Sequence, residues 1–158
     1  MGKQTHSGGC QCGAVRFRFE RPGTASICHC RMCQKAFGNY FAPLVEVEGF
    51  EWTRGKRGLF ASSNLSNRGF CRDCGTPLTL ETNSTVEVAI GSLDDAAAAQ
   101  VEYHANVQDR LEITMCLHEL PEASPQRSEE NDSWNARIVS NQHPDHDTDT
   151  WPAKETKK

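Results

Sequence analysis

The sequence lacks a long apolar segment. Only 37% of its 158 residues are hydrophobic and 8% are aromatic, and no run reaches the ~18 apolar residues of a membrane-spanning helix. The segment before the first cysteine also has no apolar stretch of the kind found in secretory signal peptides. We therefore expect a cytoplasmic protein that does not enter a membrane, with a length typical of one domain.

The chain also lacks an excess of basic charge. Its 17 Lys and Arg residues are outnumbered by 21 Asp and Glu residues, which gives a net charge of −4. Proteins that bind nucleic acid through a broad surface need a basic face to neutralise phosphates. The charge balance therefore argues against a nucleic-acid partner.

Residues 121–158 are poor in apolar residues and show no sustained hydrophobic period. They hold 5 basic and 8 acidic residues, whereas residues 1–120 are nearly balanced, with 12 and 13. A segment of this composition buries too little apolar surface to offset its chain entropy. We predict a domain over residues 1–120 and a polar, disordered tail over 121–158. The tail could contact a protein partner, and we expect His143 and His146 in it to be solvated.

Strand patterns dominate the domain, and helical signals are few. Gly and Asn residues separate short segments in which apolar and polar residues alternate, as in half-buried strands. These segments lie at 15–20, 45–48, 78–81, 86–90 and 111–115, with further candidates at 24–29 and 58–62. Helices are expected only at 31–37 and after Asp94-Asp95. The pattern predicts a mainly β fold of small sheets, in which bound metal replaces part of a small core.

Eight cysteines are the most informative residues of this sequence. Seven of them form three tight groups, which are Cys10-x-Cys12, Cys28-x-Cys30-x-x-Cys33 and Cys71-x-x-Cys74. In a reducing compartment, clustered cysteines of this spacing are typical of metal ligands rather than of disulfides. Zinc is the metal expected, because it binds thiolates in a tetrahedral arrangement.

Two of the groups resemble each other. In both Cys10-Gln-Cys12-Gly13 and Cys71-Arg-Asp-Cys74-Gly75, a glycine follows the last cysteine and an alternating segment comes next. Two such knuckles facing each other would make a closed site of four thiolates. We therefore assign Cys10, Cys12, Cys71 and Cys74 to a structural zinc.

The remaining group supplies three thiolates within six residues. Three protein ligands leave one coordination position open, as in catalytic zinc sites, so we assign Cys28, Cys30 and Cys33 to a catalytic zinc. The sequence thus predicts two zinc ions per chain. A thiol bound at the open position would be deprotonated at neutral pH.

Other arrangements of the same ligands stay open at this point. A fourth ligand such as Cys116 or a histidine could close the second site, although Cys116 is more typical of a small core residue. The group at residues 28–33 could instead share a metal with Cys71 and Cys74. It could also act as a redox sensor that releases zinc on mild oxidation.

Four basic residues lie in or beside a Gly-containing segment between strands. They are Arg54, Lys56, Arg57 and Arg68. They could bind an anionic substrate, although turn residues of this kind are more often solvated.

Four separated motifs resemble a known protein family. They are Gly9-Cys10-Gln-Cys12-Gly13, Cys28-His-Cys30-Arg-Met-Cys33-Gln-Lys, Arg68-Gly-Phe-Cys71-Arg-Asp-Cys74-Gly-Thr-Pro-Leu78 and Gly91-Ser-Leu-Asp94. Their order and spacing resemble those of the glutathione-dependent formaldehyde-activating enzymes, a family that includes centromere protein V. The resemblance covers roughly residues 6–120.

The resemblance implies a β-tent-like fold of small antiparallel sheets around zinc. It implies the structural role for Cys10, Cys12, Cys71 and Cys74, and the catalytic role for Cys28, Cys30 and Cys33. The implied activity is that of a carbon–sulfur lyase that forms S-(hydroxymethyl)glutathione from formaldehyde and glutathione. The alternative is a zinc-stabilised module that binds a protein partner without catalysis.

Overall fold

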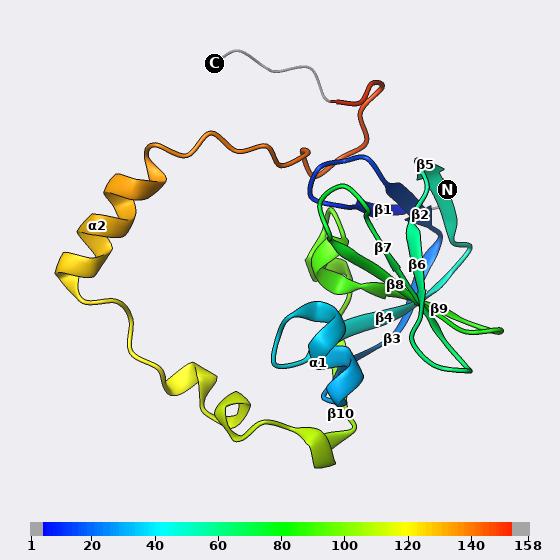
Figure 1. Ribbon diagram of the computed structural model, residues 1–158, viewed down its shortest axis with the longest axis horizontal. Coiled ribbons are helices and arrows are strands. Elements are labelled where there is room, and N and C mark those ends of the chain that lie inside the picture. Colours follow the sequence, from blue (N-terminus) through cyan, green and yellow to red (C-terminus); the bar gives the residue numbers. More distant parts are fainter. Residues whose placement is uncertain (1–4, 153–158) are drawn as a thin grey trace.

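The computed structural model describes residues 5–152, and short strands form most of its regular structure (Figure 1). The strands are β1 (His6–Gly9), β2 (Arg16–Phe19), β3 (Arg21–Cys28), β4 (Ala42–Glu48), β5 (Glu51–Arg54), β6 (Gly58–Ala61), β7 (Asn67–Phe70), β8 (Pro77–Glu81), β9 (Val86–Ala89) and β10 (Val101–Ala105). Two α-helices are described, α1 (Arg31–Phe37) and α2 (Pro125–Asn135). Within these residues no helix is long and apolar enough to cross a membrane.

Single turns of 3-10 helix join several of these elements. They are η1 (Ile90–Ser92), η2 (Ala96–Ala98), η3 (Val107–Asp109), η4 (Glu112–Met115) and η5 (Leu117–Glu119). The four alanines after Asp95 give only η2, in which the Asp95 side chain accepts a hydrogen bond from the Ala97 amide.

The strands form two sheets. A small sheet has the order β1-β2-β5, and a larger sheet has the order β10-β3-β4-β9-β8-β7-β6. All neighbouring strands are antiparallel except β10 and β3, which are parallel. This is the mainly β architecture of small antiparallel sheets that the sequence predicts.

The main core lies between the small sheet and one face of the large sheet. Phe17 and Phe19 of β2 are fully buried there with Val45 of β4 and Val88 of β9. A second, smaller buried cluster contains Cys28, Cys33 and their neighbours under α1. Because side chains alternate across a strand, the even-numbered residues of β4 face this second cluster while Val45 faces the main core.

The predicted strand at 111–115 is wrong. Residues 112–115 form the turn η4, and the side chains of Leu111, Ile113 and Met115 are exposed. Alternation stabilises a strand only where one face is buried, and no sheet covers this segment. Cys116, expected in the core, is half-buried in the turn that follows.

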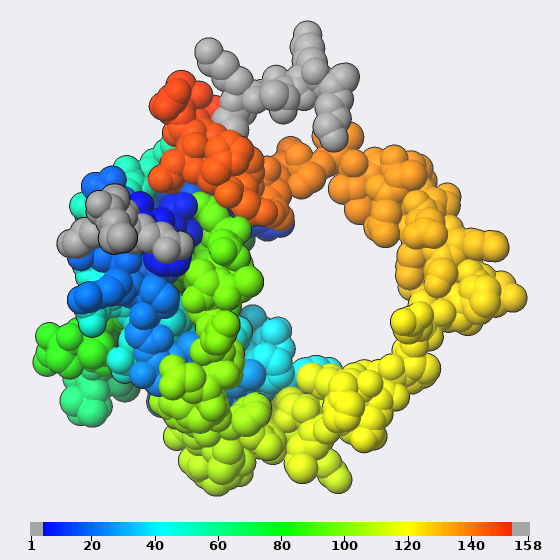
Figure 2. All heavy atoms as spheres, turned by 180° about the vertical axis from the view of Figure 1, so that it is seen from behind, coloured from blue at the N-terminus to red at the C-terminus, as the bar shows by residue number. Residues whose placement is uncertain are grey.

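The tail leaves the domain beyond β10 and curves back to it beside the small sheet (Figure 1). From residue 121 to residue 142 nearly every side chain is exposed, and Figure 2 shows this stretch standing away from the domain. Helix α2 lies within it and buries no side chain, and it was not predicted because the segment has no apolar period. Its start is set locally, since Ser124 caps it and Pro125 occupies the first turn.

The last described residues, 142–152, contact the domain and are called the clasp below. The His143 amide donates to the Gln11 carbonyl at 2.7 Å, and Trp151 Nε1 donates to the Cys12 carbonyl at 2.7 Å. Arg16 Nε donates to Asp147 Oδ1 at 2.9 Å. His143 is only 5% exposed, which differs from the solvated histidine expected in a disordered tail.

Candidate metal centres

The pairs Cys10–Cys12 and Cys71–Cys74 form two knuckles with the same backbone hydrogen bond. The Gly13 amide donates to the Cys10 carbonyl at 3.0 Å, and the Gly75 amide donates to the Cys71 carbonyl at 3.0 Å. Both glycines have φ of 78°, in the left-handed region that favours glycine. This explains why a glycine follows the second cysteine of each pair.

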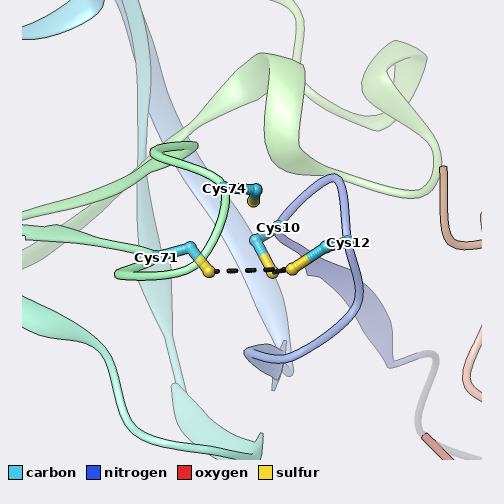
Figure 3. Close-up of side chains that lie close together, drawn as sticks. All are labelled: Cys10, Cys12, Cys71 and Cys74. Carbon is cyan, nitrogen blue, oxygen red and sulfur yellow. Dashed lines mark hydrogen bonds between the residues drawn. The ribbon is translucent and has the colours of Figure 1, made fainter. Parts of the chain in front are cut away.

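The knuckles bring four sulfur atoms together from two distant loops (Figure 3). The Sγ atoms of Cys10, Cys12, Cys71 and Cys74 all lie within 4.8 Å of one another. The distance from Cys12 Sγ is 3.5 Å to Cys10 Sγ and 3.8 Å to Cys71 Sγ. Zinc–sulfur bonds of about 2.3 Å in a tetrahedron place the sulfurs about 3.8 Å apart, so the four thiols fit a zinc ion.

The acidity of these thiols differs within the group. Burial raises the pKa of Cys12 to about 12. Burial also opposes ionisation of Cys74, but hydrogen bonds from Thr76 outweigh it and lower its pKa to about 6. Four neighbouring thiolates repel one another, so a cation at their centre is what would let all four ionise.

The third group lies where β3 ends and α1 begins. The Sγ atoms of Cys28, Cys30 and Cys33 lie within 4.8 Å of one another, and no further His, Cys, Asp or Glu of residues 5–152 joins them. Cys30 is the N-cap of α1, and its sulfur accepts a hydrogen bond from the Cys33 amide at 3.4 Å. The predicted arrangements with Cys116, or with Cys71 and Cys74, are not formed.

Two polar side chains from other strands and loops donate to these sulfurs. Arg68 Nη2 lies 3.3 Å from Cys33 Sγ, and Asn106 Nδ2 lies 3.2 Å from Cys28 Sγ. The hydrogen bond from Cys33 lowers the pKa of Cys28 to about 5, and the same hydrogen bond together with burial raises the pKa of Cys33. The donors stabilise negative charge on sulfur, which suits thiolate ligands.

A row of residues across the large sheet faces this group. Glu46 of β4, Glu87 of β9, Leu80 of β8, Arg68 of β7 and Phe60 of β6 are successive cross-strand partners. Directly opposite residues project from the same face of a sheet. Burial and then the nearby Glu46 and Cys28 raise the pKa of Glu87, and Arg68 lowers it in part. A half-buried carboxyl therefore lies on the same face as the three-cysteine group.

The histidine between two of the cysteines has a partner of its own. His29 is 1% exposed, and its Nε2 lies 3.0 Å from Nδ1 of His104. Neither ring belongs to a described cysteine group. His118 is exposed beside Glu119, and His143 and His146 belong to none of the clusters found in residues 5–152.

The basic residues around the Gly-containing segment have different environments. Arg57 pairs with Glu81 at 2.6 Å, and Arg54 donates to the Gly13 carbonyl at 3.3 Å and to the backbone of Thr148 in the clasp. Of the four basic residues, Arg68 is the one with a described hydrogen bond to a cysteine sulfur. Solvation was the favoured interpretation for all four residues, and the burial of Arg68 was missed because it depends on the pairing of β7 with β8, which places Arg68 opposite Leu80.

Asp94, the last residue of the Gly91-Ser-Leu-Asp94 motif, holds the small sheet to the turn after β9. It accepts hydrogen bonds from Arg16 Nη1 at 2.8 Å and from Ser7 Oγ at 2.5 Å. Burial would raise the pKa of Asp94, but these hydrogen bonds outweigh it and hold the pKa below its usual range. The motif therefore has a structural explanation.

A family model describes this arrangement of knuckles and strands. The model of the glutathione-dependent formaldehyde-activating enzyme matches residues 5–109, two thirds of the chain. The chain belongs to this family. The match ends before the tail, so family membership describes the domain and both cysteine groups but not α2 or the clasp.

A solved structure was also found to be similar. It is the crystal structure of a protein from Rhodobacter sphaeroides, which is 22% identical in sequence. The match covers 61% of this chain and 98% of the other, with a TM-score of 0.47.

Proposed function

We propose that the protein is a zinc-dependent enzyme of the carbon–sulfur lyase type that acts on the adduct of formaldehyde and a small thiol such as glutathione. Membership of the glutathione-dependent formaldehyde-activating family supports this class of reaction. The observation that carries the proposal is the difference between the two cysteine groups. One offers four sulfurs, whereas the other offers three and has no fourth protein ligand among residues 5–152.

The chemistry requires no reactant beyond the two substrates. The thiol sulfur attacks the carbonyl carbon, a carbon–sulfur bond forms, and the electron pair of the carbonyl bond moves to oxygen. The proton lost by the thiol ends on that oxygen, and the reverse reaction cleaves the same carbon–sulfur bond. Zinc bound by Cys28, Cys30 and Cys33 would hold the substrate sulfur as a thiolate.

The residues around the group can perform the other tasks. Arg68 and Asn106 donate to the cysteine sulfurs and so fix their orientation and balance their negative charge. Glu87 projects from the sheet face that the group occupies, and its raised pKa makes its carboxylate a stronger proton acceptor than an ordinary glutamate. We assign to its carboxylate the uptake of the thiol proton.

The proposal is tested by exchange between free formaldehyde, free thiol and adduct, measured by NMR exchange spectroscopy. We expect the full chain loaded with zinc to accelerate exchange with glutathione above the spontaneous rate. Cys30→Ser should abolish the acceleration, and the matched control Cys116→Ser should keep it, because Cys116 lies outside both groups. Equal rates with and without protein would overturn the proposal.

A second candidate function is a zinc-stabilised module that binds a protein partner through the tail. The exposed Trp134, Ile138 and Val139, on a stretch without contacts to the domain core, favour it. The exchange experiment separates the two, because a binding module would not accelerate exchange with any thiol.

A further inference from the structure

A cavity of about 210 Å³ shares Arg68 with the three-cysteine group, because Arg68 lines the cavity and also donates to Cys33 Sγ. Helix α1 bounds it with Phe37, and the large sheet bounds it with Phe60, Phe70 and Pro77. Pockets that enclose a drug-sized ligand usually measure about 300–1,000 Å³. The cavity is therefore large enough for one arm of a small molecule and too small for all of a tripeptide.

The one charged side chain that lines the cavity, among the residues described, is Arg68. It is 8% exposed, its Nη2 donates to Cys33 Sγ, and its Nε donates to Ser62 Oγ at 3.0 Å. Its Nη1 is buried and has no hydrogen-bond partner among the described residues. A buried donor without an acceptor is costly, and one that has already lost its water gains a full hydrogen bond when an anion reaches it.

The walls of the cavity indicate which other chemical groups a ligand with that anion would carry. Phe37, Phe70 and Pro77 give it apolar sides, and Phe60 at its edge is 62% exposed. A ligand chain of methylene groups would cover the exposed ring of Phe60 and bury apolar surface.

Charge on the rest of the sheet face restricts where an anion can bind. Glu87 and Glu46 occupy the other end of the cross-strand row that contains Arg68. A carboxylate near them would be repelled, whereas one at the Arg68 end would be paired. The row therefore orients a ligand that has a single carboxylate on this side.

We propose that this cavity binds the carboxylate-bearing arm of the thiol substrate, with Arg68 Nη1 donating to the carboxylate and the aromatic residues covering the methylene groups. The substrate class is thus a thiol with a carboxylate a few bonds from the sulfur, of which the glycine arm of glutathione is one form. The sulfur end of this inference rests on the proposed function, whereas the carboxylate site does not.

The carboxylate site is tested first without sulfur. The probe is 3-phenylpropionate, compared with 3-phenylpropionamide, and binding to the zinc-loaded full chain is followed by ligand-observed NMR. We expect the acid to bind at least about tenfold more tightly than the amide, as for a charge-assisted hydrogen bond in a desolvated site. Equal binding of acid and amide, or no binding of the acid at millimolar concentration, would overturn the proposal.

The variants identify the residue responsible. Arg68→Gln should reduce the preference for the acid to near unity, and Arg68→Lys should restore part of it. Arg57→Gln is the matched control, because Arg57 is paired with Glu81 and does not line the cavity. Should Arg68→Gln fail to fold, Phe60→Ala provides the test at an exposed position, and it should weaken the acid several-fold. An unchanged preference for the acid in Arg68→Lys together with an unchanged affinity for the acid in Phe60→Ala would contradict the site.

A second pair of probes links the cavity to the sulfur position. 3-Mercaptopropionate and 3-mercaptopropionamide share the same thiol and differ only in the carboxylate. We expect both to bind by isothermal titration, the acid about tenfold more tightly. Equal binding of the two would contradict the carboxylate site and leave the proposed function standing. Binding of 3-phenylpropionate with no binding of either thiol would contradict the proposed function and leave the cavity as a carboxylate site.

Discussion

The four-cysteine group takes its sulfurs from two knuckles, with Cys12 and Cys71 lying 59 residues apart in sequence. The three-cysteine group takes its sulfurs from one segment of six residues. A metal at the first group would tie the small sheet to the large one, whereas a metal at the second would add no link between distant segments. The first group is therefore suited to hold the fold, and the second to exchange a ligand without unfolding the domain.

The two groups also differ in where the hydrogen-bond donors to their sulfurs come from. The four-cysteine knuckles satisfy their sulfurs mainly from nearby residues, as when the Val15 amide donates to Cys10 Sγ at 3.3 Å. The three-cysteine group instead receives Arg68 and Asn106 from elsewhere in the fold and faces Glu87. Polar side chains gathered at a group with three ligands are typical of a site that acts on a substrate.

The largest expected effect comes from opening the four-cysteine group. We predict that Cys71→Ser unfolds the domain, because a structural zinc contributes on the order of 10 kcal/mol to folding. Cys30→Ser should keep the fold and lose the metal of the second group only. Circular dichroism, thermal melting and zinc analysis of both variants measure this. A folded Cys71→Ser variant beside an unfolded Cys30→Ser variant would reverse the two assignments.

The next largest loss of stability is expected from breaking the ion pair between Arg16 and Asp94. Asp94→Asn leaves the buried Arg16 without its main partner, since Asp147 of the clasp is exposed. Removing one member of a buried pair costs about 3–5 kcal/mol, and we expect a loss of free energy of unfolding at the lower end of that range. The control is the exposed, neighbouring Asp95→Asn, which should cost well under half as much.

The pH dependence of the stability lost in Asp94→Asn tests the role of the Asp94 carboxylate. The folded state lowers the pKa of Asp94, so its contribution to stability is present above the unfolded pKa of about 3.9 and is lost as pH falls through the lower folded value. Urea unfolding at several pH values should show wild type and Asp94→Asn converging in acid. Curves that stay parallel to the lowest pH would contradict the role of Asp94.

A smaller effect is expected from the clasp. Removing residues 142–158 deletes the hydrogen bonds to Gln11 and Cys12, and we predict a loss of about 1–2 kcal/mol. Because the clasp contacts the first knuckle, zinc should leave the four-cysteine group faster in EDTA while the other group is unaffected. The matched variant Trp151→Phe keeps an aromatic ring but loses the indole N–H donor, so it should show a fraction of the same effect. Equal acceleration at both groups would contradict the comparison.

The sequence predicted elements whose signals are local. Helix α1 has the predicted limits, Arg31–Phe37, because Cys30 caps its start and Gly38, with φ of 56°, ends it. The strands β2, β4, β8 and β9 followed from alternation, because one face of each packs against a core. Strand β10 was missed since most of its side chains are exposed, and its stability comes from parallel pairing with β3.

The same distinction applies to the candidate site. The grouping of the seven sulfurs could be predicted from spacing and from the glycine after each knuckle, and the metal itself stays a prediction. The contacts of Arg68 and Asn106 could not be predicted, because they join residues 35 and 78 positions away from the cysteines they reach. The clasp could not be predicted either, since its few apolar residues give no periodic signal.

The smallest effect we predict is a gain in stability at the three-cysteine face. Burial, Glu46 and Cys28 raise the pKa of Glu87, so its charge destabilises the folded state above the folded pKa and has no effect below the unfolded pKa of about 4.3. Glu87→Gln should therefore raise the melting temperature at pH 7 by about 1–3 °C, and the gain should vanish near pH 4. Thermal melts at the two pH values measure this.

The same substitution connects stability with the proposed reaction. If Glu87 takes up the thiol proton, Glu87→Gln should also lower the exchange rate about 10²-fold or more, as for loss of a general base, so stability rises as activity falls. Glu102→Gln, on the exposed side of β10, is the control and should change neither quantity appreciably. A Glu87→Gln variant that is less stable at pH 7, or equally active, would show that this carboxylate faces solvent or a partner and does not serve the three-cysteine group.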